Sequence, residues 1–281
     1  MPEAIVSLVI AALMAATCFP AVLHHREIAR QRTCSSNLKN IGGAIWAHRG
    51  AWGLFPNNLL PPYQLLPYLP PDDAHPWKPG VEPDDTTPGH PVWRCPTDEM
   101  THNDSSRMSY CWSTGSGTFS DHADDGFVGD RRLSVAHFTD GTSHTAAASE
   151  TRVFIDDLVH VDRTTWAADK AYSLWREREA FRQDCATIPL DERHSTLSQR
   201  GTKWLQTELY DHLFSPNSRS CESSALVGES GFAKCYAANS EHPGGVHLLL
   251  VDGSVRFISD SIDLEVWSAL STRAGSETID W

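Results

Sequence analysis

Residues Ala4–Leu23 read AIVSLVIAALMAATCFPAVL, twenty consecutive residues without a charged side chain. A helix of this length spans roughly 30 Å, which is the thickness of the hydrocarbon core of a bilayer. Three interpretations are open: a retained membrane helix, a cleaved signal peptide and a buried core helix. A signal peptide expects a basic segment ahead of the apolar run, whereas Met1-Pro2-Glu3 supplies an acid. We therefore favour a retained transmembrane helix.

The helical pattern continues beyond the apolar run. Apolar residues recur at spacings of four, three and four, which predicts one apolar stripe made of Cys34, Leu38, Ile41 and Ile45. Pro20 predicts a kink, and Gly42-Gly43 weakens the helix towards its end. We expect residues 1–49 to form one long helix, half in lipid, whose second half lays its stripe on a globular domain of residues 50–281.

The composition of the chain excludes one class of partner. It holds 36 acidic and 23 basic residues, for a formal charge of −13, and 40% of its residues are hydrophobic. That hydrophobic fraction is enough for a packed core. The acidic balance argues against nucleic-acid binding, which requires a basic face.

The globular part reads as α+β with an antiparallel sheet. Residues 56–96 hold 12 of the 17 prolines, a density that no long helix or central strand tolerates. We expect strands at Ser109–Ser113 and Ala146–Phe154 and a helix at Asp169–Gln183.

The C-terminal region carries the clearest local pattern. Val246–Val251 and Ser254–Ile258 are joined by Asp252-Gly253, which predicts a hairpin with both turn residues at positive φ. A terminal helix is expected at Ile262–Leu270, with Asp260 or Ser261 as its N-cap.

Three segments together carry a family resemblance. The first is Phe19-Pro-Ala-Val22, Arg26-Glu-Ile-Ala-Arg30 and Cys34-Ser-Ser-Asn-Leu-Lys-Asn-Ile-Gly42. The second is Thr139-Asp-Gly-Thr-Ser-His-Thr145 with Glu150, preceded by Trp93-Arg-Cys-Pro96. The third is His242-Pro-Gly-Gly-Val and Asp252-Gly-Ser-Val-Arg-Phe257, with nine residues between the His and the Asp. In this order they resemble the pilin-like proteins of planctomycetes, a family of unknown function with a prepilin-type N-terminus and a His-x9-Asp-Gly signature.

The resemblance implies a pilin-like fold, with a long N-terminal membrane helix, an antiparallel sheet and long Pro-rich, disulfide-stapled loops. It assigns the family motif to Asn37, Leu38, Asp140, Gly141, Thr142, Ser143, His242, Pro243, Gly244, Gly245, Asp252 and Gly253. Pilin-like heads carry a Glu seventeen residues before the helix proline, as Glu3 and Pro20 are here. The basic leader and cleavage-site Gly of the family are missing, so we expect a misplaced or degenerate start.

Each candidate residue also has a simpler interpretation. Glu3 is either an exposed terminal acid or, in assembly, the partner of a neighbouring subunit's terminal amine. We interpret His242 as structural, with its imidazole bonded to backbone groups, in preference to a metal ligand. The Thr139–Ser143 segment predicts a turn packed against the Asp252-Gly253 hairpin. The acidic loop Ser120–Asp130 suits calcium by its oxygen ligands, but its spacing is not that of an EF-hand, so a solvated loop is favoured.

Seven cysteines are present, and six of them follow Cys18 in the apolar run. No C-x-x-C motif occurs, so zinc ribbons and thioredoxin chemistry have no support. Disulfides are the simplest reading in an oxidising compartment. Of the 15 possible connectivities, we favour Cys34 with Cys95 and Cys221 with Cys235.

We expect a non-catalytic protein, because no H-E-x-x-H, G-x-S-x-G, P-loop or G-x-G-x-x-G motif occurs. We expect no metal or other cofactor. The favoured function is a pilin-like or pseudopilin-like subunit of a surface or secretion apparatus, with other pilin-like subunits as partners. The alternative is a membrane-tethered domain that binds a ligand, glycan or protein without polymerising, and a third reading is a calcium-dependent adhesive module. In each case we expect a single-pass protein of the cell membrane, with its globular domain periplasmic or extracellular.

Overall fold

The computed structural model describes residues 2–56, 61–72, 83, 87–98, 105–116, 125–129, 131–153, 165–168, 174–188, 195–196, 200–223 and 234–277. The helices are α1 (Pro2–Trp52), α2 (Pro61–Leu65), α3 (Leu174–Thr187) and α4 (Leu264–Ala269), with 3₁₀ turns at Leu66–Tyr68, Pro91–Trp93 and Val135–His137. The strands are β1 (Tyr110–Ser113), β2 (Ala146–Glu150), β3 (Thr165–Ala168), β4 (Ser195–Thr196), β5 (Leu209–Tyr210), β6 (Ser220–Ser223), β7 (Lys234–Cys235), β8 (Gly245–Leu250) and β9 (Val255–Ser259).

A five-stranded sheet in the order β5-β1-β2-β8-β9 organises the body, and a smaller sheet has the order β4-β3-β6-β7. The expected α+β class is confirmed, but the expectation of an antiparallel sheet is wrong. Strand β1 pairs in parallel with β5, and β3 pairs in parallel with β6, so both sheets are mixed. Parallel strands cannot be joined by a short turn, so their partners are distant in the sequence. No local turn signal therefore indicates these pairings.

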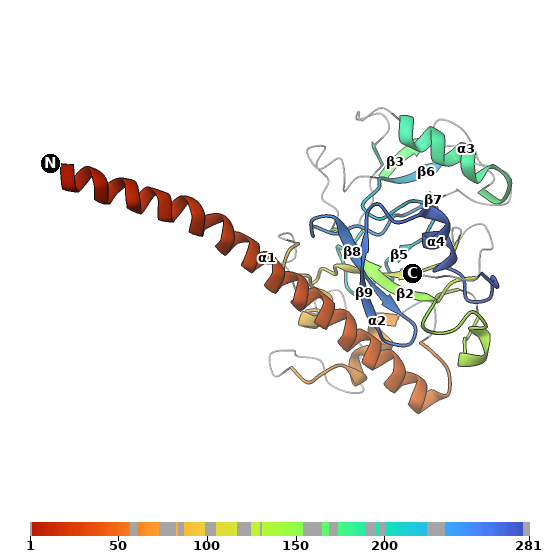
Figure 1. The fold of residues 1–281 in the computed structure, drawn as a ribbon. Coiled ribbons are helices and arrows are strands. Elements are labelled where there is room, and N and C mark those ends of the chain that lie inside the picture. The colour runs from red at the N-terminus through yellow and green to blue at the C-terminus, as the bar shows by residue number, and fades with distance from the viewer. Residues whose placement is uncertain are drawn as a thin grey trace.

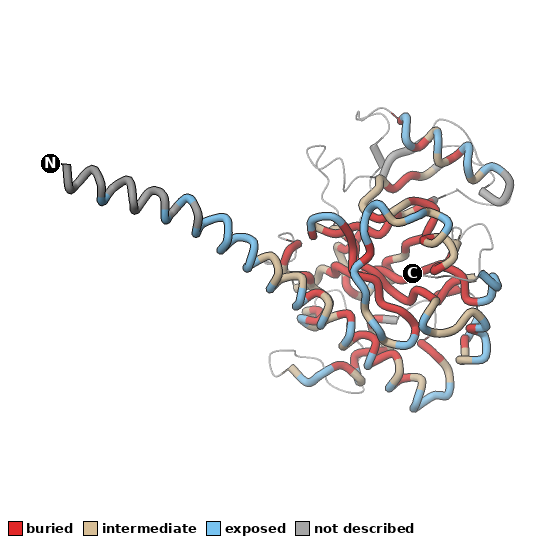
Figure 2. Tube along the Cα trace, viewed as in Figure 1, coloured by how far each residue is buried: buried red, intermediate tan, exposed pale blue. Residues whose placement is uncertain are grey.

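Helix α1 is both a core layer and a projecting rod. Its 51 residues extend about 75 Å at the usual helical rise. Its second half lies along the body, while its first half projects away from the body (Figure 1). Figure 2 shows the change from buried to exposed residues along the helix. The predicted stripe is confirmed, because its four members are at most 1% exposed: Cys34, Leu38, Ile41 and Ile45.

The five-stranded sheet is covered on both faces. Leu249 of β8 belongs to the core cluster that contains the stripe of α1. Its neighbours Leu248 and Leu250 belong to a second cluster, which includes Trp267 of α4. Because successive residues of a strand point to opposite faces, this burial on both sides explains the three consecutive leucines Leu248–Leu250 at the end of β8.

Among helices of the described residues, none is long and apolar enough to cross a membrane.

The Asp252-Gly253 hairpin forms between β8 and β9, with a turn that differs from the prediction. The Gly253 amide donates to the Leu250 carbonyl, and the Leu250 amide donates to the Ser254 carbonyl. Gly253 has φ of 90°, whereas Asp252 is not among the described residues with positive φ. The connection therefore has three residues and ends in a left-handed glycine, unlike the predicted two-residue turn.

The ends of helices α3 and α4 differ from the predicted ones. The N-cap of α4 is Asp263, whose carboxylate accepts from the Glu265 amide at 2.8 Å, in place of the expected Asp260 or Ser261. Helix α3 spans Leu174–Thr187, four residues beyond the expected end; the expected start at Asp169 lies outside the described residues.

Two disulfides join cysteines of the described residues. Cys34–Cys95 is confirmed and joins α1 to the segment that follows the 3₁₀ turn at Pro91–Trp93. The predicted Cys221–Cys235 bridge is wrong, because Cys221 is bonded to Cys185 of α3. Cys235 lies opposite Cys221 in the β6–β7 ladder, so all three sulfurs share one cluster and sequence spacing does not decide between them.

Gly42 lies at a close contact between α1 and the sheet. A Cβ atom there would lie 2.9 Å from Leu249 Cδ1 and 3.1 Å from Gly253 Cα, while a Cβ at Gly43 would meet nothing within 4 Å. The expectation that the Gly pair weakens the helix misses the packing function of Gly42. Gly42 permits the close packing of α1 on the β8–β9 turn.

This contact predicts opposite effects for two neighbouring alanine substitutions. Gly43→Ala should raise the free energy of unfolding by about 0.5–1 kcal/mol, because alanine favours helix. Gly42→Ala gains the same propensity but overpacks a close contact, which costs about 1–3 kcal/mol. Urea unfolding of the full chain in detergent, followed by tryptophan fluorescence, should separate the two variants by at least about 1 kcal/mol. Equal stability of the two variants would show that the close contact is absent.

The disulfide assignment is tested by peptide mapping without reduction. We expect linked peptides containing Cys34 with Cys95 and Cys185 with Cys221, because the paired Cα atoms lie 5.2 Å and 6.1 Å apart, within the normal range for disulfides. A linked peptide containing Cys221 and Cys235 would contradict the second assignment.

Candidate functional site

His242 lies at the centre of a buried polar cluster where α1 leaves the body. We call this group the His242 cluster; its members are Glu27, Cys34, Cys95, Glu150, His242 and His247. The turn that carries His242 is held beside β2, because the Asn239 amide donates to the Glu150 carbonyl at 2.9 Å. The His242 amide donates to Ser240 Oγ, and Gly244 follows with φ of 83°. These contacts hold the turn that carries the imidazole.

The two ring nitrogens of His242 face different partners. Nδ1 lies 2.7 Å from Glu27 Oε1 on α1 and 3.3 Å from Thr97 Oγ1. Nε2 lies 3.3 Å from Glu150 Oε1 and 3.5 Å from Cys95 Sγ. The imidazole is fully enclosed. The expectation that it satisfies backbone groups is therefore wrong, because its partners are side chains from three separate segments.

Glu150 is the most deeply buried acid of the cluster. Its Oε2 accepts from the His247 backbone amide at 2.8 Å, and its Oε1 lies 3.2 Å from His247 Nδ1. Burial alone would raise the pKa of Glu150, but the hydrogen bonds from His242 and His247 outweigh burial and lower this pKa to about 2. Burial would lower the pKa of His242, but Glu150 and Glu27 raise it above its usual value. Both shifts favour an ion pair between Glu150 and His242.

Two further motif residues, Asn37 and Leu38, lie on helix α1. Asn37 Nδ2 donates to the Arg94 carbonyl at 2.9 Å, and Leu38 is fully buried in the stripe. Trp46 Nε1 donates to the Val251 carbonyl at 2.8 Å, beside the glycine turn of the hairpin. Asn37 therefore binds the body at Arg94, and Trp46, which is not a motif residue, binds it at the hairpin.

The Thr139–Ser143 loop packs on the hairpin turn, as predicted. The Asp252 amide donates to the Thr142 carbonyl at 2.9 Å, and Gly141 has φ of 101°. Asp252 Oδ1 accepts from the Ser254 amide, which fixes the turn. Asp140 has a function that the motif did not indicate: its carboxylate accepts from the amides of Gly275 and Ser276 and so holds the C-terminal segment.

Packing explains one of the other two glycines of the signature, and the other adopts a positive φ. Gly245 has no room for a side chain, because a Cβ there would collide with the Ile258 carbonyl of β9. Gly244 has a positive φ and open space around it. Pro243 lies between His242 and Gly244 in the same turn. The His-x9-Asp-Gly signature therefore joins the His242 cluster at one end of β8 to the helix contact at the other.

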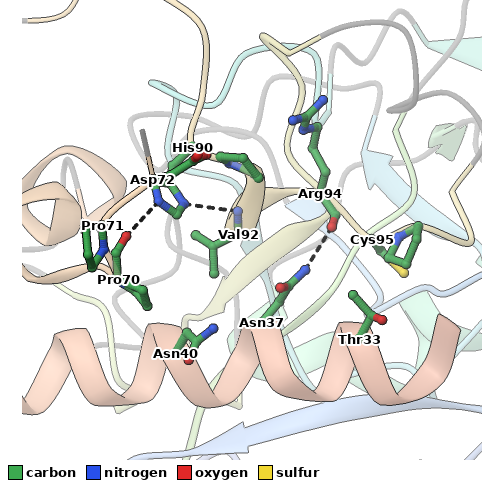
Figure 3. Close-up of a pocket in the computed structure, with 12 residues that line it drawn as sticks. Thr33, Asn37, Asn40, Pro70, Pro71, Asp72, His90, Val92, Arg94 and Cys95 are labelled. Carbon is green, nitrogen blue, oxygen red and sulfur yellow. Dashed lines mark hydrogen bonds between the residues drawn. The ribbon is translucent and has the colours of Figure 1, made fainter. Parts of the chain in front are cut away.

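A pocket of about 420 Å³ lies between α1 and two Pro-containing segments. In Figure 3, Thr33, Asn37 and Asn40 line it from the helix, opposite Pro70–Asp72 and His90–Pro96. His90 closes one side, since its Nδ1 accepts from the Val92 amide and its Nε2 lies 3.0 Å from the Pro70 carbonyl. Cys95 is part of the lining, so the pocket reaches one of the two cysteines of the Cys34–Cys95 disulfide.

Two other predicted sites are not built by the described residues. The side chain of Glu3 lies outside them. Of the acidic loop, the side chains of residues 121, 124 and 130 also lie outside them, and Asp125 accepts from the amide and hydroxyl of Ser116. The calcium hypothesis stays untested. Glu27 and Glu150 were quoted within motifs but given no role, and His247 was missed, because their partners are distant in sequence.

One comparison with known proteins matches a family model. Residues 67–265 match the family model SBP_bac_10, described as "Protein of unknown function (DUF1559)". The matched region contains Cys95, Glu150, His242 and His247, whereas Glu27 and Cys34 precede it. No curated protein and no solved structure matches the chain.

The two acids bonded to His242 should contribute unequally to stability. Glu150→Gln leaves two histidines beside a buried amide and should cost about 3–5 kcal/mol, the usual effect of breaking a buried ion pair. Glu27→Gln is the matched control, since Glu27 contacts the same imidazole but its side chain is 21% exposed. Its cost should stay near 1 kcal/mol or below, as for exposed pairs. Urea unfolding at pH 7 of oxidised, chelator-treated protein measures both, and equal losses would contradict this hierarchy.

Proposed function

The chain belongs to the DUF1559 family of proteins of unknown function, and we propose that it is a non-catalytic, pilin-like subunit anchored in a membrane by helix α1. In this proposal the first half of α1 packs in lipid beside helices of neighbouring subunits, and the body is presented outside the cytoplasm. The observation that carries the proposal is the form of α1, half core layer and half projecting rod (Figure 1).

Exposed apolar side chains on the projecting half support the proposal. Met14, Phe19, Val22 and Leu23 are 57%, 66%, 54% and 48% exposed. All four belong to the uncharged run Ala4–Leu23. Apolar surface of this extent on one rod is unfavourable in water and indicates an apolar environment or a helical partner.

The joint between α1 and the body also suits an assembling subunit. The Cys34–Cys95 disulfide links the helix to the body covalently, and Glu27 binds His242 where the helix leaves the body. A subunit in a filament must transmit its position from its helix to its body, which requires a rigid joint. Disulfides persist in oxidising compartments, which agrees with a body outside the cytoplasm.

The alternative function is a tethered binding domain that does not polymerise. The pocket beside Asn37 and Asn40 favours this alternative, because it offers polar groups and a cavity of about 420 Å³. Both functions use α1 as an anchor, so only helix–helix contact distinguishes them.

Crosslinking through Cys18 tests the proposal. Cys18 is an exposed free thiol on the projecting half, while Cys111 and Cys235 are fully buried. A bismaleimide reagent added to native membranes should therefore join neighbouring helices through Cys18. Glu3→Ala should leave the protein in the membrane fraction but lower crosslinking at least about tenfold. The substitution removes the partner of a neighbouring subunit's terminal amine, and an unpaired charge in lipid costs about 3 kcal/mol.

Two controls complete the experiment. Ser7→Ala alters an exposed polar residue of the same helix without removing a charge and should crosslink like the wild type. Cys18→Ser should abolish crosslinking. Monomer alone in wild-type membranes, or equal crosslinking in wild type and Glu3→Ala, would favour the tethered binder.

A further inference from the structure

We propose that, when the Cys34–Cys95 disulfide is reduced, the two thiolates join His242 Nε2 and the Glu150 carboxylate to bind a divalent metal ion of the zinc class. One ligand atom from each of these four buried residues lies within 4.8 Å of all the others. Two thiolates, an imidazole and a carboxylate form a ligand set that zinc uses in proteins. The inference is independent of whether the protein assembles.

The distances agree with a tetrahedral site. Zinc–ligand bonds of about 2.0–2.3 Å place the ligand atoms of a tetrahedron roughly 3.3–3.8 Å apart. The structure has 3.3 Å between His242 Nε2 and Glu150 Oε1, and 3.5 Å between His242 Nε2 and Cys95 Sγ. Reduction frees the two sulfurs to move apart to about 3.7 Å, the distance expected for two zinc-bound thiolates. The remaining pairs of ligand atoms lie within 4.8 Å of one another.

The groups behind the ligands are also those of a metal site. A metal-bound histidine commonly donates its other N–H to a carboxylate, and here Glu27 Oε1 lies 2.7 Å from His242 Nδ1. That bond directs Nε2 towards Glu150 and Cys95. Glu150 Oε2 is held by the His247 amide at 2.8 Å, which leaves Oε1 on the side of His242. Both non-sulfur ligands are thus oriented before a metal binds.

The chemistry needs an external reductant and an entry path. A dithiol reductant supplies two electrons and two protons: its two thiols become a disulfide, and Cys34 and Cys95 become thiols. The metal ion then replaces both thiol protons and the proton on His242 Nε2, and these protons pass to solvent. The pocket of Figure 3 supplies the path, because Cys95 is part of its lining.

The metal and the disulfide would perform the same structural task in different redox states. Each links α1 to the segment at Cys95, and the metal adds Glu150 of β2 and the His242 turn. The joint would therefore remain cross-linked when its disulfide is open.

Cobalt(II) is the probe for this site. Full-length protein in detergent is reduced with dithiothreitol, desalted without oxygen and titrated with Co²⁺. We expect one Co²⁺ per chain, with thiolate-to-cobalt charge-transfer bands and tetrahedral visible bands that Zn²⁺ abolishes. Oxidised protein should show neither. Bound metal should also protect Cys34 and Cys95 from alkylation, as read by peptide mass.

Variants identify the ligands. Cys95→Ser and His242→Gln should each weaken binding at least about a hundredfold, since even outer contacts of metal sites are worth 10–100-fold. Cys221→Ser removes the other disulfide and should bind Co²⁺ like the wild type. Circular dichroism checks that each variant is folded, and the alkylation pattern of the wild type is independent of any variant. Absence of the bands in reduced wild type, or wild-type binding by Cys95→Ser, would overturn the proposal.

Discussion

The contact between helix α1 and the β8–β9 turn, at Gly42 and Gly253, is the constraint on which the rest of the structure depends. The helix lies so close to the turn that a Cβ at Gly42 would be 3.1 Å from Gly253 Cα. This approach brings the stripe of α1 onto the face of the sheet that contains Leu249. It also brings Trp46 to the Val251 carbonyl. Without it the sheet would lose the layer that covers one of its faces.

The His242 cluster provides a second attachment, which fixes the direction of helix α1 relative to the body. The glycine contact holds the middle of the docked half, whereas Glu27 binds His242 where the exposed part of α1 gives way to partly buried residues. Two separated attachments define the direction of a rod, and the Cys34–Cys95 disulfide lies between them in sequence. Buried charges such as Glu150 are costly to desolvate, so we ascribe to them specificity of docking more than net stability.

Local patterns predicted local structure well. The stripe from Cys34 to Ile45 and the Asp252-Gly253 hairpin follow from side-chain period and turn chemistry, and both are present. Long-range partners were not predictable from spacing. His242 meets Glu27 across 215 residues, and the parallel partner of β1 is β5. Cys221 had two cysteines within reach, and the nearer one in sequence is its ladder partner and not its disulfide partner.

Hydrogen exchange of the full chain tests most directly whether docking of α1 is integral to the fold. If it is, the backbone amides of α1 between Leu38 and His48 should exchange with the same free energy as those of β8, because neither can open without global unfolding. Exchange of these α1 amides at a clearly lower free energy than β8 would show that the helix detaches from an otherwise intact domain, and would contradict the account.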